Sequence, residues 1–314
     1  MGETVTQLSY TDTHVVDFAD GARIETTTTY YPPPVAPPSV EPRLAGVHDA
    51  RAVAVAAVLF PGTSLAREFI NGVQTGPRSL IAKAEIACRP SWNIGIIPIY
   101  SLKLNLAEVM AGTWDAQIRE LADWHVDQPP AELVIQHEPE NDTTMQGGAF
   151  PRYFNHIAAQ FRTANDRMML LYAAMLYQWL PGSVNGTIKG FTSSPADWKG
   201  VDCDRHMADV YSGNSAPLAT ILPEHKGFQR WMELIVGDRP WGVAERGFVT
   251  ATDHKGRSAA IAREKDWLLN DPVGRLCRRY VYWNTAGTEN NPAIVVDQSY
   301  GEPAVRDLVI ALNS

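Results

Sequence analysis

The sequence predicts a (β/α)8 barrel preceded by a short N-terminal β arm, and three observations support this. From about residue 43 the chain alternates apolar strand-like runs with amphipathic helix-like runs, about eight units over roughly 270 residues, near the typical barrel length. The strand-like runs lack a clean alternation of apolar and polar residues, as expected of a parallel sheet covered on both faces. The sequence contains neither GxGxxG nor GxxxxGK[ST], one of which a doubly wound open sheet would usually carry. The barrel is therefore favoured over that alternative.

The arm is predicted to span residues 1–42. The runs VVDF and ARIETTTTYY flank Ala19-Asp20-Gly21, which is a good β-hairpin signal. The segment 31–42, YPPPVAPPSVEP, contains six prolines and should be extended and stiff. We interpret this segment as the boundary to a barrel domain at 43–314. The arm could contact the barrel, another subunit or a larger assembly, and the sequence leaves these alternatives open.

The elements of the barrel follow in order along the chain. A helix is predicted at 107–125, where apolar residues recur with helical spacing, and another at 150–165, with a proline near its start. The run 79–87 is ambiguous between strand and helix. Further helices are predicted at 226–236, 257–270 and 302–313. Strands are predicted at 52–62, 93–101, 131–138, 167–175, 207–213, 240–248 and 278–285.

Composition excludes several classes of protein. A net charge of -8 argues against a nucleic-acid binder, which normally presents a basic face. The three cysteines are widely spaced and form no zinc pattern, so buried free thiols are expected. The N-terminus has no basic segment followed by an apolar one, so it is not a standard secretory signal, and the longest apolar run is too short to cross a bilayer. A soluble protein without a membrane span is expected.

Two of the predicted strands end in a glutamate. LVIQHEPEND (133–142) runs from apolar residues into His137-Glu138, and WGVAERG (241–247) runs into Glu245. The two glutamates are 107 positions apart, about three βα units, so the count places them after the fourth and seventh strands. Active sites of such barrels lie at the carboxyl ends of the strands, so both carboxylates should face one another across the same rim.

Two facing carboxylates are what glycoside hydrolysis requires, one protonated to donate a proton and the other ionised to attack. HEPEND followed by WGVAERG resembles the retaining glycoside hydrolases of clan A. The nearest part of that clan is the β-mannanase-like branch, in which histidine precedes the strand-four glutamate. The resemblance covers most of residues 43–314 as an architecture, through short motifs. It implies that Glu138 is the acid/base and Glu245 the nucleophile.

The resemblance also suggests residues that bind the sugar. A clan tyrosine near the end of strand six often hydrogen-bonds the nucleophile, and an aromatic platform commonly ends strand eight. Glu140 and Asp142 are expected chiefly to cap the following segment or to lie in solvent, and most tryptophans to pack in the core, with Trp179 and Trp198 in a loop region open to substrate. The predicted substrate-binding residues are His137, Asn141, Asp209, Tyr211, Trp283 and Tyr100, with Asp142 and Lys103 as weaker candidates.

The function predicted from these residues is a retaining, endo-acting glycoside hydrolase that acts on a polysaccharide or oligosaccharide without a cofactor or metal. One alternative is a non-catalytic carbohydrate- or receptor-binding barrel of a larger assembly, such as a phage tail. Another is a metal-dependent hydrolase, because VDCDRHMAD (201–209) gathers several possible ligands. That run has no HExxH or EF-hand pattern, and along a strand its last aspartate points away from 204 and 206. No GxSxG elbow supports a serine esterase.

Overall fold

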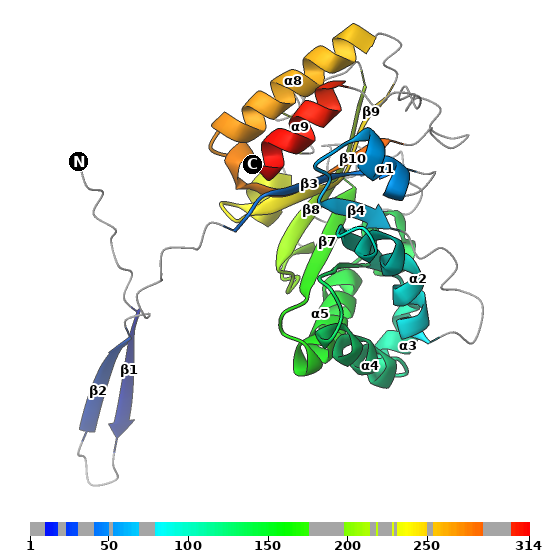
Figure 1. Cartoon of the computed structure of the whole chain (residues 1–314). Helices are drawn as coiled ribbons and strands as arrows, with labels where there is room; N and C mark the ends of the chain where they lie inside the picture. Colours follow the sequence, from blue (N-terminus) through cyan, green and yellow to red (C-terminus); the bar gives the residue numbers. More distant parts are fainter. Residues whose placement is uncertain are drawn as a thin grey trace, which may run out of the picture. The chain divides into compact units, whose positions relative to one another are not determined.

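The computed structural model describes residues 10–17, 23–30, 41–49, 53–68, 79–175, 198–213, 218, 228, 231–249, 254–284 and 303–314. The chain divides into two compact units, Met1–Glu41 and Pro42–Ser314 (Figure 1). In the first unit, β1 (Tyr10–Asp17) pairs antiparallel with β2 (Arg23–Tyr30), as the hairpin signal predicts. The turn residues of that signal, and 31–40 of the proline-rich segment, lie outside the described residues.

The second unit is a closed barrel of eight parallel strands, which confirms the predicted fold class. Each strand pairs with the next in chain order, and the last returns to pair with the first. The strands are β3 (Leu44–Asp49), β4 (Leu65–Glu68), β5 (Ile97–Leu102), β6 (Glu132–Ile135), β7 (Met169–Met175), β8 (Arg205–Gly213), β9 (Trp241–Val249) and β10 (Cys277–Asn284).

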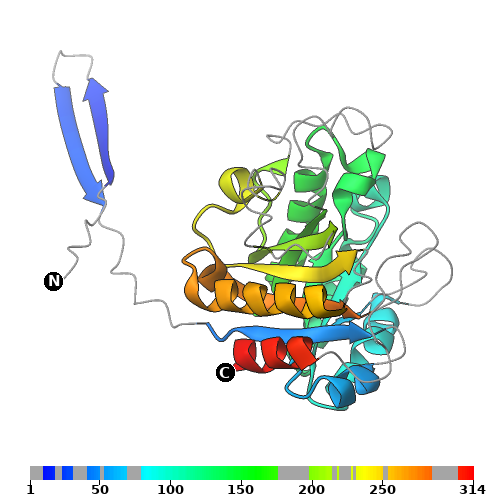
Figure 2. The same ribbon diagram turned by 90° about the horizontal axis from the view of Figure 1, so that it is seen from above.

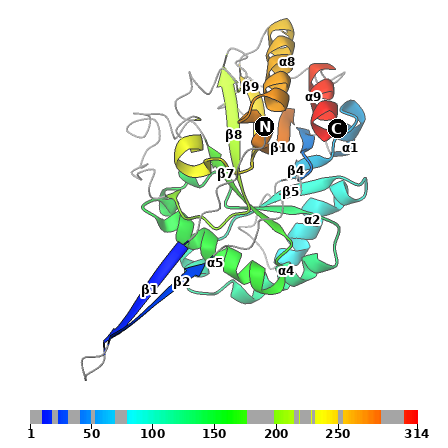
Figure 3. The ribbon, with the colours of Figure 1, turned by 90° about the vertical axis from the view of Figure 1, so that its left-hand side faces the viewer.

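Helices cover the outside of the barrel. Figure 3 shows α2, α4 and α5 along one part of the wall, and Figure 2 shows α8 and α9 side by side on another. None of the helices within the described residues is long and apolar enough to cross a membrane. Among the described residues, the α-helices are α1 (Val53–Leu59), α2 (Leu80–Trp92), α3 (Leu106–Met110), α4 (Asp115–Val126), α5 (Ala149–Ala164), α8 (His254–Asn270) and α9 (Pro303–Asn313), with a π-helical turn at Met232–Val236.

The inside of the barrel is filled in layers, as a packed core requires. Near the amino ends of the strands, Arg279 on β10 forms a buried ion pair with Glu132 on β6 at 2.5 Å. Above this pair lies a wholly apolar layer, whose buried members are Leu65, Ile99, Val134, Leu171, Ala173, Met207, Ala244 and Val281. Residues at neighbouring positions of the same strands point outward and pack under the helices in a larger core. The polar residues described below lie above the apolar layer, at the carboxyl ends.

In the first third of the barrel, one sequence-based assignment is wrong and one ambiguous run is resolved. The run 52–62, predicted as a strand, contains α1, and the strands of that region are β3 and β4. Alanine favours helix, and Val53 and Ala56 share one buried side while Val58 is exposed, so the apolar run follows a helical rather than a strand period. The ambiguous run 79–87 belongs to α2, which Ser79 caps through its side chain.

Residues 107–125, predicted as one helix, form α3 and α4. Gly112 separates them with a positive φ of 76°, which glycine adopts without strain. The three cysteines are free, and Cys88 and Cys277 are buried as expected, whereas Cys203 is only partly buried.

Candidate active site

The segment after β6 turns sharply and brings the side chains of His137 and Glu138 to the barrel mouth. Gln136 and Glu138 have positive φ values of 55° and 46°, a conformation that costs a non-glycine residue about 1–3 kcal/mol. The Glu138 N–H donates to the Ala173 carbonyl of β7 at 3.2 Å, so the turn still follows the neighbouring strand. Strain of this kind persists only where contacts over-determine the backbone, and it is commonest at functional sites.

A β-bulge in β9 places Glu245 on the same mouth. Between Val243 and Arg246 this strand has one residue more than either neighbour, as the register with β8 and with β10 shows. Ala244 belongs to the inner apolar layer, and Glu245 also points inward, whereas Arg246 points outward to Glu264 of α8. If the strand alternated strictly through Ala244, without the bulge, Glu245 would point to the outside.

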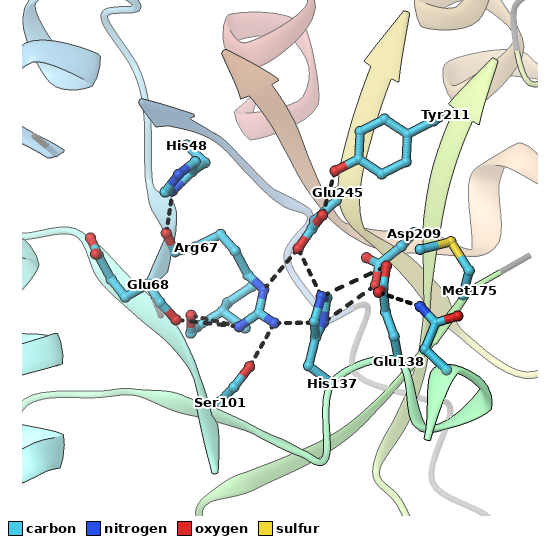
Figure 4. Close-up of polar contacts among 12 residues, drawn as sticks. His48, Arg67, Glu68, Ser101, His137, Glu138, Met175, Asp209, Tyr211 and Glu245 are labelled. Atoms are coloured by element: carbon cyan, nitrogen blue, oxygen red, sulfur yellow. Dashed lines mark hydrogen bonds and ion pairs between the residues drawn. The ribbon is translucent and has the colours of Figure 1, made fainter. Parts of the chain in front are cut away.

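On β8, ordinary alternation brings two side chains to the site. Met207 lies in the inner layer, so Asp209 and Tyr211 face the same way, at successively higher levels. The Tyr211 hydroxyl donates a short hydrogen bond to Glu245 Oε2, and Asp209 Oδ2 lies 3.4 Å from His137 Nδ1. Figure 4 shows these residues grouped around the His137 ring.

Arg67, on β4, supplies a fixed positive charge to the cluster. Its side chain is fully buried, and its Nε lies 3.9 Å from Glu245 Oε1. The Nη2 atom donates to Ser101 Oγ at 2.7 Å, and the Nη1 atom donates to the Ile99 carbonyl at 3.3 Å. These contacts with β5 hold the guanidinium in one orientation (Figure 4).

Arg67 also determines the tautomer of His137. The guanidinium can only donate, and its Nη2 lies 3.0 Å from His137 Nδ1, so Nδ1 accepts and the ring proton is on Nε2. That Nε2–H faces Glu245 Oε1 at 3.3 Å and Glu138 Oε1 at 3.8 Å. Burial, and then the charges of Arg67 and Lys103, lower the pKa of His137 well below its usual value. His137 is thus neutral, and its Nε2–H lies on the side of the two carboxyl groups.

The two glutamates have different electrostatic surroundings. Burial raises the pKa of Glu138 to about 8, with the charges of Glu245 and Glu140 adding to the effect. Asn141 Nδ2, which donates to Glu138 Oε2 at 2.8 Å, acts against this rise. Burial also raises the pKa of Glu245, but Arg67 and the Tyr211 hydroxyl lower it. The proton therefore resides preferentially on Glu138, and the negative charge on Glu245.

Asp209 is a third carboxyl in this cluster, 1% exposed. Its pKa is raised well above the usual value, by burial first and then by Glu245 and Glu138. The neighbouring His137 Nδ1 already accepts a hydrogen bond from Arg67. If Asp209 were ionised, its Oδ2 and this Nδ1 would be two acceptors facing each other with no proton between them. Both facts favour a neutral, protonated Asp209.

The cluster contains the ligand types of a metal site. His137, Glu138, Asp209 and Glu245 each offer one donor atom, and these atoms lie within 4.8 Å of one another. A divalent cation there would have to displace the protons of the raised carboxyls and share the cluster with the Arg67 charge. The donor set is compatible with a cation by type, but the nearby guanidinium already supplies the positive charge that the carboxylates need.

The structure places the other predicted site residues as follows. Asn141 contacts Glu138, and the weaker candidates Lys103 and Asp142 lie 3.9 Å apart, with Asp142 capping the next turn by accepting from Thr144 N–H. Trp283 is the penultimate residue of β10 and pairs with His48 of β3. Its side chain lies outside the described residues, as does the whole of Trp179. Trp198 is buried against Phe150.

Tyr100 and Glu140 do not lie where the sequence predicts them. Tyr100 is fully buried outside the barrel wall, where its hydroxyl contacts His125 Nε2 of α4 at 2.7 Å, because Ile99 and Ser101 occupy the inward positions of β5. Glu140, expected chiefly as a cap or a solvated charge, is fully buried.

Three polar residues at the mouth were not predicted from the sequence. Arg67 and Ser101 were overlooked, as was His48 of β3, which contacts the Arg67 carbonyl through Nδ1 at 2.6 Å. The available signal was a charged pair, Arg67-Glu68, at the end of a short apolar run, but a four-residue strand is too short to show a period.

No protein-family model matches the sequence, and no curated protein sequence is significantly similar to it. Similar solved structures are glycoside hydrolases. An endo-β-1,3-glucanase of family GH128 from Sorangium cellulosum has a TM-score of 0.54 and 14% identity, over 86% of this chain and 97% of that one. A GH10 xylanase from Thermobacillus composti has a TM-score of 0.55 and 10% identity, over 87% and 97%. The catalytic domain of endoglucanase Cel5A from Thermobifida fusca has a TM-score of 0.51 and 12% identity, over 87% and 92%. At these identities the likeness establishes the barrel fold, which is the fold the resemblance to clan A implied.

Proposed function

We propose that this protein is a retaining, endo-acting glycoside hydrolase with Glu138 as acid/base and Glu245 as nucleophile. The observation that carries the proposal is the pairing of the two carboxyls at the barrel mouth, where the pKa of Glu138 is raised to about 8 while Arg67 and Tyr211 act to lower the pKa of Glu245. One oxygen from each lies within 4.8 Å of the other. Carboxyl separations of about 5–5.5 Å are typical of retaining enzymes, and about 6.5–9.5 Å of inverting enzymes, so this distance supports retention.

In the first step, Glu138 would donate its proton to the glycosidic oxygen while Glu245 attacks the anomeric carbon. The bond to the leaving sugar breaks, and a covalent glycosyl-enzyme forms. Glu138, now ionised, would then remove a proton from water as that water attacks the same carbon and releases Glu245. Arg67, Tyr211 and His137 would hold the Glu245 carboxylate in position through the contacts described above.

The proposed substrate is a polysaccharide. Solved neighbours with the same fold include enzymes described as an endo-β-1,3-glucanase, a xylanase and an endo-β-1,4-mannanase. A panel of β-1,3-glucan, cellulose oligomers, mannan and xylan is therefore the first set to test. A purely sugar-binding barrel needs no cluster of buried, mutually repelling carboxyls, which costs folding stability, so the geometry favours the enzyme.

The test uses the substrate that the panel identifies, linked to a good leaving group. Glu245→Gln should lose turnover by at least about a thousandfold, while its unfolding midpoint stays at or above that of the wild type. Glu138→Ala should form the glycosyl-enzyme but hydrolyse it slowly, and azide, which needs no general base, should restore turnover as a glycosyl azide of retained configuration. An inverted product, or near-normal activity of the Glu245 variant, would overturn the assignment.

A further inference from the structure

The charged turn after β6 contains one buried acid that the proposed chemistry does not use. Glu140 is fully buried, two residues after Glu138 in the short 3-10 turn Pro139–Asn141. An acid in such a place requires hydrogen-bond partners, because an unpaired buried charge is strongly destabilising. Glu140 has them on β7, the strand that follows β6 around the barrel.

Both carboxylate oxygens of Glu140 contact β7. The Tyr172 hydroxyl donates to Oε1 at 2.5 Å, and the Met175 backbone N–H donates to Oε2 at 3.2 Å. Tyr172 points outward from the barrel and packs on Phe150 of α5, with ring centroids 4.8 Å apart. The turn therefore passes over the end of β7. Glu138 lies in the mouth, and Glu140 is hydrogen-bonded to β7 on the outer side of the barrel, under the helices.

The same anchor serves the rest of the cluster. Met175 ends β7 and pairs in register with Asp209 of β8, so the Glu140 contact fixes the strand end beside Asp209 as well. Glu138 itself has a strained backbone, which requires contacts on either side to persist. On one side the Glu138 N–H bonds to Ala173, and on the other the Glu140 carboxylate bonds to Tyr172 and Met175.

We propose that Glu140 is a positioning residue, which fastens the Glu138-bearing turn to β7 and places a fixed negative charge beside the acid/base. The proposal rests on the proposed function for its kinetic consequences. Its structural part, the influence of Glu140 on Glu138, holds whether or not the correct sugar is found. Its charge is among the causes that raise the pKa of Glu138.

The test compares Glu140→Gln, Tyr172→Phe and Tyr153→Phe with the wild type. The glutamine keeps the shape of Glu140 but removes the charge, so the pKa of Glu138 should fall. The alkaline limb of the pH profile of kcat/KM should therefore move to lower pH by about half a unit or more. Tyr172→Phe keeps the charge of Glu140 and removes one of its two hydrogen bonds to β7. The kcat should therefore fall about fivefold, with the alkaline limb of the pH profile unchanged. Tyr153→Phe is the matched control, since its buried hydroxyl bonds only the Leu104 backbone among the described residues, and it should change neither quantity.

A second measurement is independent of activity. Titration of 13C-labelled glutamate carboxyls, with Glu138 assigned from Glu138→Gln, should show the Glu138 midpoint lowered in Glu140→Gln and unchanged in Tyr153→Phe. An unchanged midpoint in a folded Glu140→Gln would overturn the inference while leaving the proposed hydrolase intact. If the wild type cleaves no glycan but the midpoint shifts, the inference stands and the proposed function fails.

Discussion

Replacing Glu138 by glutamine should stabilise the fold, and the gain should depend on pH. The ordinary pKa of this carboxyl is 4.5, and in the folded protein it is raised to about 8. The unfolded chain therefore loses this proton at a lower pH than the folded protein, so the carboxyl costs stability as pH rises from 4.5 towards 8. At about 1.4 kcal/mol per pH unit, the full cost at pH 8 is at most about 5 kcal/mol. The side chain is 17% exposed, so we expect about 2–3 kcal/mol.

Urea unfolding near pH 4.5 and near pH 8 measures this difference, because both ends of the shift are sampled. The variant should match the wild type at the lower pH and exceed it at the higher one, since glutamine can still accept the Asn141 hydrogen bond without a charge. Glu120→Gln, an exposed position on α4, is the control and should show no comparable change. Equal effects at both pH values, or a less stable variant near pH 8, would refute the electrostatic account.

Two further predictions concern the charges of the cluster. Arg67→Met removes a cation 3.9 Å from Glu245, an interaction of about 4 kcal/mol at an effective dielectric constant of 20, so kcat/KM near neutral pH should fall a hundredfold or more and the acidic limb should move up. Arg67→Lys, which keeps the charge, should recover part of this loss, and an unmoved limb in the methionine variant would contradict the role given to Arg67. Dialysis against EDTA should leave activity unchanged, and restoration by a divalent cation after such a loss would reassign the four-ligand cluster to a metal.

The sequence predicts the fold and the strand-end acids because both depend on simple rules. Eight βα units of ordinary length indicate the barrel, and a glutamate at the end of an apolar run in the fourth and seventh units must lie near the mouth. The count of strands succeeded although β3 and β4 were not themselves predicted. The run at 52–62, wrongly predicted as a strand, and the ambiguous run at 79–87 stood in their places.

Other features of the site depend on side-chain direction, which a local pattern does not fix. Tyr100 and Ser101 are neighbours, yet one faces the helices and the other faces Arg67, and the period of the short β5 run could not decide between them. From the sequence, Glu140 is expected to be a surface acid. Its burial depends on Tyr172, 32 positions later, which only the fold brings into contact with it. The three acids of HEPEND thus have separate environments: Glu138 at the mouth, Glu140 behind the wall and Asp142 at a cap.

The additional residue in β9 sets the direction of two adjacent, oppositely charged side chains, one pointing into the barrel and the other toward the helices. Glu245 reaches the mouth, while Arg246 forms a fully buried pair with Glu264, which also accepts a hydrogen bond from Tyr280. Regular pairing through Ala244, without the bulge, would turn Glu245 and the residues after it to the opposite face of the strand. The Arg246 guanidinium would then face the mouth and the Glu245 carboxylate would lie on the side of Glu264, so the bulge at this one point matters to the proposed chemistry as much as the identity of the acid.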